Sequence, residues 1–136
     1  MSALNENALT LLNSETIDTQ NGDSKTIVYT VPVDKTAIIT MVIVHTPSAN
    51  LVGGSDFNIG SGDDADTWKQ RVDLSWITTT SQALIIHAEG TRVCTLFLPE
   101  VAWLPIEIAG AEFGIKPVTG TVADTTAIMA VFGYLF

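Results

Sequence analysis

Residues 36–46, Thr-Ala-Ile-Ile-Thr-Met-Val-Ile-Val-His-Thr, decide the fold class of this chain. β-Branched side chains dominate the run, and such side chains lose χ1 freedom in a helix but fit a pleated sheet. Alternate positions of a strand point to opposite faces. Here both faces are apolar, with Ile39, Met41 and Ile43 on one and Ile38, Val42 and Val44 on the other. The run therefore predicts a central strand that is covered on both sides.

Further short strands are expected on either side of this run, separated by turn-forming residues. They cover residues 27–33, 56–59, 69–77, 82–88, 91–98, 101–108, 113–117 and 125–136. We expect 82–88 and 91–98 to form a hairpin across Glu89-Gly90, and the last two strands to pair across residues 119–121. Trp76 alternates in phase with Val72 and is expected in the core.

The order of these strands predicts the architecture. No helix of crossover length separates them, which excludes a parallel α/β sheet. An antiparallel, jelly-roll-like β-sandwich of about eight strands is the all-β fold that suits this number and spacing. We assign residues 25–136 to this sandwich.

Residues 1–24 differ from the rest because they are polar, with Leu4, Ala8, Leu11 and Leu12 at helical spacing. A two-turn amphipathic helix, an extended arm that orders against a neighbouring subunit, and a disordered segment are all compatible with this pattern. We treat residues 1–24 as a separate N-terminal arm or short helix.

The charge balance excludes several classes of partner. The chain has 136 residues, with 15 acidic side chains against 6 Lys and Arg and a net charge of −9. A protein that binds nucleic acid through its phosphates needs a basic face, which six scattered cations do not provide. The same charge balance disfavours binding to an anionic membrane, and no apolar run reaches the ~18 residues that span a bilayer.

The chain is too apolar to hide all its hydrophobic surface as a monomer. Its composition is 46% hydrophobic and 15% charged, and a domain of this size buries only about two-thirds of its unfolded surface. Residues 113–136 contain two charges, Lys116 and Asp124. Large exposed apolar patches usually mark interfaces. We therefore expect a homo-oligomer, a dimer or a trimer, with Phe132, Tyr134 and Phe136 in the interface. A monomer with a tightly filled core is the alternative interpretation.

The residues that carry chemistry form no recognisable catalytic motif. His45 and His87 end separate strands, and no Gly-x-Ser-x-Gly elbow or zinc spacing is present. We expect no enzymatic activity and no cofactor. Asp63, Asp64 and Asp66 form a weak candidate for a Ca²⁺ site, because hard oxygen ligands in a glycine-containing loop suit that ion. A solvated acidic loop is the alternative interpretation.

The only cysteine, Cys94, lies in an apolar run, which is typical of a small buried side chain rather than a disulfide framework. The first residues have no cationic or long apolar region, so we expect no signal peptide and folding in a cytoplasm.

Several segments resemble small all-β virion proteins of tailed bacteriophages. They are residues 30–40, 53–60, 65–68, 113–120 and 131–136, and the resemblance covers most of residues 25–136. Together with the small size, it implies a capsid decoration (cement) protein with a jelly-roll body. Such proteins bind the capsid exterior as homo-oligomers and bridge neighbouring major capsid subunits. The implied location is the outer surface of the virion, after synthesis in the host cytoplasm.

The residues suggest where such a protein would make its contacts. Shell or neighbour contact is expected from apolar side chains of the N-terminal segment, namely Leu4, Leu9, Leu11 and Leu12. The alternative function is a tail-fibre, receptor- or carbohydrate-binding β-sandwich module. That function predicts Trp68 or Trp103 exposed beside the acidic loop, since exposed aromatic side chains form such sites.

Overall fold

The computed structural model describes residues 9–88, 91–95 and 98–136, with the backbone alone over 91–95 and 98–103. These residues form ten β-strands and no helix. The strands are β1 (Thr10–Asp18), β2 (Thr26–Thr30), β3 (Ala37–His45), β4 (Asp56–Gly60), β5 (Lys69–Val72), β6 (Ala83–His87), β7 (Thr91–Thr95), β8 (Leu98–Trp103), β9 (Glu112–Thr119) and β10 (Thr126–Leu135).

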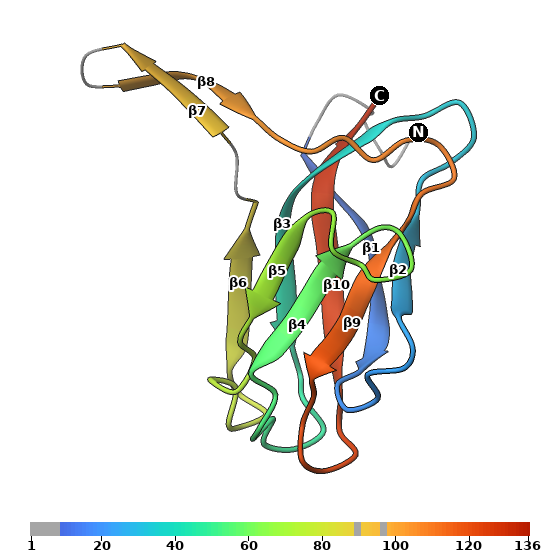
Figure 1. The fold of residues 1–136 in the computed structure, drawn as a ribbon, viewed down its shortest axis with the longest axis vertical. Helices are drawn as coiled ribbons and strands as arrows, with labels where there is room; N and C mark the ends of the chain where they lie inside the picture. The colour runs from blue at the N-terminus through green and yellow to red at the C-terminus, as the bar shows by residue number, and fades with distance from the viewer. Residues whose placement is uncertain (1–8, 89–90, 96–97) are drawn as a thin grey trace.

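Eight of these strands form a sandwich of two antiparallel sheets (Figure 1). Sheet A has the order β1-β10-β3-β6, and sheet B has the order β2-β9-β4-β5. With the β7–β8 pair set aside, the eight strands taken in chain order give 1-8-3-6 and 2-7-4-5, which is the jelly-roll arrangement. The predicted fold class is confirmed.

The core lies between the two sheets and follows the period-two alternation of the strands. Sheet A contributes Ile39 and Met129, and sheet B contributes Phe57 and Phe113, all of them fully buried. Trp68 packs its ring edge-to-face on Phe113, with centroids 5.8 Å apart. Pairing of β3 between β10 and β6 confirms that the run at 36–46 is a central strand.

The predicted boundary at residue 24 is wrong. Thr10–Asp18 is not a helix or a detached arm but edge strand β1 of sheet A, paired with β10 from Thr10–Gly133 to Asp18–Thr126. The strand is polar because most of its side chains are exposed at the edge of the sheet. Its partner lies more than a hundred positions away in the sequence, so local spacing did not reveal it. Residues 1–8 lie outside the described residues.

Two expected hairpins are also wrong. Strand β6 pairs with β3 and not with β7, while β9 and β10 belong to different sheets. In a jelly roll, consecutive strands pass from one sheet to the other, so strands adjacent in sequence need not pair. Strands β7 and β8 instead form their own hairpin, which projects from one end of the sandwich (Figure 1).

Candidate functional site

The outer face of sheet A is the most distinctive surface of the molecule. Its three adjacent strands β10, β3 and β6 contain no Asp, Glu, Lys or Arg. Their alternate residues Val42, Ile86 and Val131 are buried in the core. The residues between them therefore point outward, away from sheet B.

The strand register places these outward side chains in rows across the sheet. Ile43 lies opposite Ile85 on β6 and Ala130 on β10. Met41 lies opposite Phe132, and Phe132 lies opposite Leu11 on β1. Further rows hold Ile38 opposite Tyr134 and His45 opposite Ile128.

No segment among the described residues covers this face. Ile85 is 55% exposed, and Met41, Ile43 and Phe132 are half-buried. The expectation that 36–46 is covered on both sides is therefore met on one side only, by sheet B. The second apolar face of β3 has no partner among the described residues.

The structure places on one face residues that were predicted to belong to two separate contact surfaces. Leu11, predicted for shell or neighbour contact, is the cross-strand partner of Phe132, predicted for the oligomer interface. Tyr134 lies on the same face, and its ring centroid is 6.5 Å from that of the exposed Phe136. Leu11, Phe132 and Tyr134 therefore lie on one face of sheet A.

The remaining N-terminal candidates lie elsewhere. Leu9 is exposed, whereas Leu12 is half-buried and packs against the core, so its role in a contact surface stays a prediction. A bulge between Leu11 and Asn13 inserts one extra residue and turns Leu12 inward. Leu4 lies outside the described residues.

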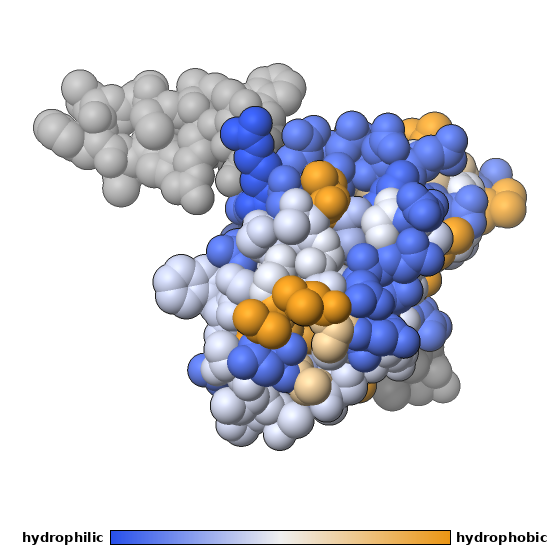
Figure 2. Space-filling view, turned by 60° about the horizontal axis from the view of Figure 1, so that its bottom comes forward, coloured by the Kyte–Doolittle hydropathy of each residue, from blue (hydrophilic) through white to orange (hydrophobic). Residues whose placement is uncertain are grey.

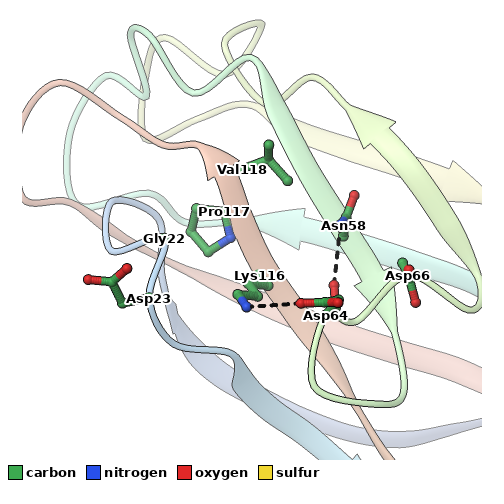
Figure 3. A pocket seen from close by; sticks show the side chains of 8 residues that line it. All are labelled: Gly22, Asp23, Asn58, Asp64, Asp66, Lys116, Pro117 and Val118. Carbon is green, nitrogen blue, oxygen red and sulfur yellow. Dashed lines mark hydrogen bonds and ion pairs between the residues drawn. The ribbon is translucent and has the colours of Figure 1, made fainter.

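The outer face of sheet B is polar by contrast. It carries a shallow hollow of about 450 Å³. Figure 3 shows the residues that line it, namely Gly22, Asp23, Asn58, Asp64, Asp66, Lys116, Pro117 and Val118. The Lys116 ammonium pairs with Asp64 at 3.3 Å, and Asn58 donates a hydrogen bond to the Asp64 carbonyl at 3.2 Å. Charged side chains therefore lie in this hollow, whereas strands β10, β3 and β6 of sheet A contain none.

The acidic loop does not bring its aspartates together. Asp64 and Asp66 line the hollow shown in Figure 3, whereas Asp63 lines a separate one beside Lys25. Lys25 donates hydrogen bonds to the carbonyls of Gly62 and Glu112 and so fixes that side of the loop. In the described ranges, no three His, Cys, Asp or Glu side chains lie close enough to hold a metal ion. The weak Ca²⁺ candidate therefore lacks a site geometry.

Trp68 and Trp76 each lie in an environment opposite to the one predicted from the sequence. Trp68 is 5% exposed, and its indole N–H donates to the Ile39 carbonyl at 2.9 Å, so it is not a sugar platform. Trp76, predicted in the core, is 74% exposed. Strand β5 ends at Val72, and Asp73 accepts hydrogen bonds from the Ser75 backbone N–H and hydroxyl. That turn breaks the alternation. The Trp103 side chain lies outside the described residues.

Trp76 stands in a hollow of about 440 Å³ between β5 and β6. Lys69, Arg71, Asp73 and His87 contribute its polar groups, and Ile85 and Leu84 contribute apolar surface. Arg71 has a φ of 59°, in the left-handed region that non-glycine residues rarely adopt. No motif in the sequence indicated this site.

The loops after β3 and β9 meet at one end of the sandwich. Val52 and Val122 are exposed there, and the Val122 N–H donates a hydrogen bond to the Val52 carbonyl. Figure 2 looks onto this end and shows small apolar patches among hydrophilic side chains.

The two histidines lie apart. His45 and His87 end β3 and β6 as expected, but His87 lies opposite Met41, four residues from His45 along β3. The His45 ring nitrogen hydrogen-bonds to Thr46 at 2.8 Å. Glu107 is 3% exposed and accepts a hydrogen bond from the Thr67 hydroxyl at 3.1 Å. Glu112 is exposed.

Comparison with known proteins adds no relative. No family model, curated protein or solved structure matches this chain. Over the described ranges, the structure contains no helix of the length and hydropathy needed to span a membrane.

Proposed function

We propose that this chain is a structural virion protein, a capsid decoration protein that binds the outside of a phage shell as a homo-oligomer and stabilises it by bridging neighbouring major capsid subunits. The observation that carries the proposal is the uncharged outer face of sheet A on an otherwise acidic jelly roll. Such a face is stabilised by contact with another protein surface.

The acidic remainder of the molecule supports the same function. A net charge of −9 disfavours contact with packaged DNA and favours a position on the exterior. A protein that binds only the assembled shell stabilises that shell by mass action. Many copies acting together compensate for a modest affinity at each site.

Association with particles tests the proposal directly. Phage particles that carry this chain are banded in a density gradient and probed with antibody before and after disruption. We expect the chain to band with intact particles and to be labelled without disruption. Recovery of the chain only among free proteins would contradict the proposal.

Shell stabilisation needs a second experiment. Particles that lack the chain are heated with and without added purified chain, and DNA release is followed by dye fluorescence. We expect the added chain to raise the release temperature. Bound chain that leaves this temperature unchanged would remove the stabilising role.

The second candidate is a receptor- or carbohydrate-binding module, and the exposed Trp76 favours it. An exposed indole beside the Arg71 guanidinium provides an apolar ring face and hydrogen-bond donors, which together suit a sugar ring. A glycan array compares the wild-type chain with Trp76→Ala. Binding that the substitution abolishes would favour this function, and an array without a reproducible hit would count against it.

A further inference from the structure

The hollow in which Trp76 stands lies at the edge of the sandwich where β5 ends sheet B and β6 ends sheet A (Figure 1). Its volume is about 440 Å³. Lys69, Arg71 and Asp73 line it from β5 and the turn that follows, and His87 lines it from β6. The hollow therefore joins an aromatic ring to several polar groups from both sheets.

The turn that carries Trp76 is anchored on both sides of that residue. Leu74 and Ile77 are fully buried. The Leu74 N–H donates to the Gly54 carbonyl at 2.9 Å, and the Ile77 carbonyl accepts from the Leu51 N–H at 3.0 Å. The indole, which is 74% exposed, is thus held in solvent by a fixed turn. A ring that is already in position loses little conformational freedom when a ligand binds.

Arg71 lies in a β-bulge of the edge strand β5. Lys69 lies opposite Ile59 and Val72 lies opposite Phe57, so β5 has two residues where β4 has one. Arg71 is one of these two, and its φ of 59° is a conformation that glycine adopts without strain and arginine does not. Bulges re-aim side chains beside binding sites, and such strain is concentrated at functional sites. The strain at Arg71 therefore points to a role for its side chain.

The hollow is positively charged on an acidic protein. Two of the six Lys and Arg residues of the chain, Lys69 and Arg71, line it. Asp73 is the one carboxylate among the described residues that line it, and its Oδ1 accepts hydrogen bonds from the Ser75 N–H and hydroxyl. With histidine counted as neutral, one net positive charge is left. The hollow therefore attracts a single anionic group, whereas a chain of charge −9 repels a polyanion.

We propose that this hollow binds a sugar that carries one carboxylate, the class to which uronic and sialic acids belong. The proposal deepens the second candidate function, since it rests on carbohydrate binding and names the class of sugar. The apolar C–H face of the sugar ring packs on the Trp76 indole and on Ile85, which also lines the hollow. The carboxylate pairs with the Arg71 guanidinium, whose planar donors fit two carboxylate oxygens.

The charge of the hollow distinguishes a carboxylate from a phosphate. A guanidinium binds both groups with similar geometry. A phosphate monoester, however, carries a charge of about −1.5 to −2 at pH 7, which exceeds the one positive charge that the hollow provides. A carboxylate carries a single charge and is matched by it.

Titration of the ¹⁵N-labelled chain tests the proposal through the indole NMR signal of Trp76, which is identified by its absence from Trp76→Phe. The ligands are the methyl glycosides of glucuronic, galacturonic and N-acetylneuraminic acid, each compared with its uncharged methyl ester. We expect at least one acid to bind with a Kd at least about ten-fold lower than its ester, because a charge-assisted hydrogen bond is lost in the ester.

Two results of this titration would overturn the proposal. One is an equal Kd for acid and ester in all three pairs, or no shift of the Trp76 signal with any of them. The other is an acetate Kd as low as that of the best acid, because the hollow would then recognise charge without a sugar ring.

Substitution of Arg71 separates a binding role from a structural one. Arg71→Gly removes the guanidinium and also relieves the backbone strain. We expect its affinity for the acid to fall at least about ten-fold, to that of the ester, while its thermal midpoint is no lower than that of the wild type. Lys116→Gln removes the same charge from the outer face of sheet B and is expected to keep the wild-type affinity. Equal losses of affinity in the two variants would overturn the proposal.

Substitution of the indole has a matched control. Trp76 and Val122 are both 74% exposed. In saturation-transfer NMR, which detects the bound sugar, we expect the signal to vanish with Trp76→Ala and to persist with Val122→Ala. A signal that persists with Trp76→Ala would overturn the proposal.

The outcome is separable from those of the two candidate functions. Acids and esters that bind equally at Trp76 would reject the acidic ligand and keep carbohydrate binding. Selective binding of an acid by a chain that never bands with particles would keep this site and reject decoration.

Discussion

Three buried threonines hold together the turns at one end of the sandwich. The Thr19 hydroxyl donates to the Thr125 carbonyl at 2.8 Å and lies 3.2 Å from the Thr121 hydroxyl. Thr125 donates in turn to the Thr121 hydroxyl at 2.9 Å, and Thr121 donates to the Ala123 carbonyl at 2.8 Å. These bonds join the turn after β1 to the turn before β10, so each hydroxyl is buried with its hydrogen bonds made.

Replacing Thr19 with Val removes the hydroxyl and keeps the shape of the side chain. We expect the free energy of unfolding to fall by about 1–3 kcal/mol, because buried partners lose a hydrogen bond. Urea denaturation of Thr19→Val and of Thr16→Val, an exposed position on β1, is the measurement. Equal losses of unfolding free energy in the two variants would contradict a stabilising role for the three buried threonines.

Tyr29 provides the pH dependence that the structure supports. Burial raises the pKa of its phenol above the usual value of 10.0. Below pH 10 the Tyr29 phenol is protonated in both the folded and the unfolded chain, so it does not lower the free energy of unfolding. As pH rises from the unfolded-state pKa through the folded-state pKa, the unfolded chain loses the proton first and stability falls.

Tyr29→Phe is therefore expected to lose less stability than the wild type as pH rises above 10. Chemical denaturation between neutral pH and pH 11 measures the free energy of unfolding of both proteins. The contribution of the lysines cancels in the comparison because both chains contain them. Parallel pH profiles for the two proteins would contradict the assignment.

Residue-level predictions from the sequence failed where a turn interrupted an alternating pattern. Trp76 continues the phase of Val72 and Leu74, but β5 ends at Val72 and the Asp73 turn carries Trp76 into solvent. Trp68 follows a polar loop, yet a hydrogen bond to Ile39 and the edge of Phe113 hold it inside. An alternating sequence pattern predicts the face on which a side chain lies only while the strand continues without interruption.

At the scale of elements, Gly133 marks the bulge at which β10 changes its register against β3. A Cβ at this position would lie 2.1 Å from the Ile38 carbonyl oxygen, which is closer than atoms approach without a shift of the backbone. The close approach explains why a glycine stands in the middle of an otherwise apolar strand.

Gly133→Ala is expected to reduce the free energy of unfolding by about 1–3 kcal/mol through this overpacking. Thermal denaturation followed by circular dichroism measures it. A variant with an unchanged midpoint would show that β3 and β10 are not packed this closely at the bulge.

Strand positions were largely predictable from the sequence, whereas strand pairings were not. The boundaries of β3, β4 and β6 follow apolar runs bounded by Pro, Gly and polar residues, which are local signals. Pairing of β1 with β10 joins the two ends of the chain, and no local signal encodes it. The polar sequence of β1 reflects its place at an edge, which only the complete sheet defines.

At the scale of the whole molecule, the two sheets differ in the charge of their outer faces. Sheet A is uncharged across three adjacent strands, while sheet B carries Lys116 with the acidic loop over it. Composition predicted an apolar interface, and the strand order brings uncharged side chains together on the outer face of sheet A. Leu11 and Phe132, distant in the sequence, meet on one face because β1 and β10 pair.

Self-association through an uncharged face predicts a definite response to salt. Added salt screens the repulsion between copies of charge −9 and leaves the apolar contact intact. We expect the oligomer to strengthen between low and about 0.5 M ionic strength, as measured by sedimentation velocity. Weakening over this range would indicate that ion pairs hold the copies together.

The mass of the chain in dilute solution tests the central claim most directly. Sedimentation equilibrium is measured on the wild type and on two matched variants, Ile85→Glu and Val118→Glu, at positions that are 55% and 57% exposed on the outer faces of sheets A and B. We expect a small whole-number multiple of 14.5 kDa for the wild type and for Val118→Glu, and a shift toward 14.5 kDa for Ile85→Glu. A wild-type mass of 14.5 kDa at every concentration, or an Ile85→Glu mass equal to that of the wild type, would contradict the claim that copies meet on sheet A.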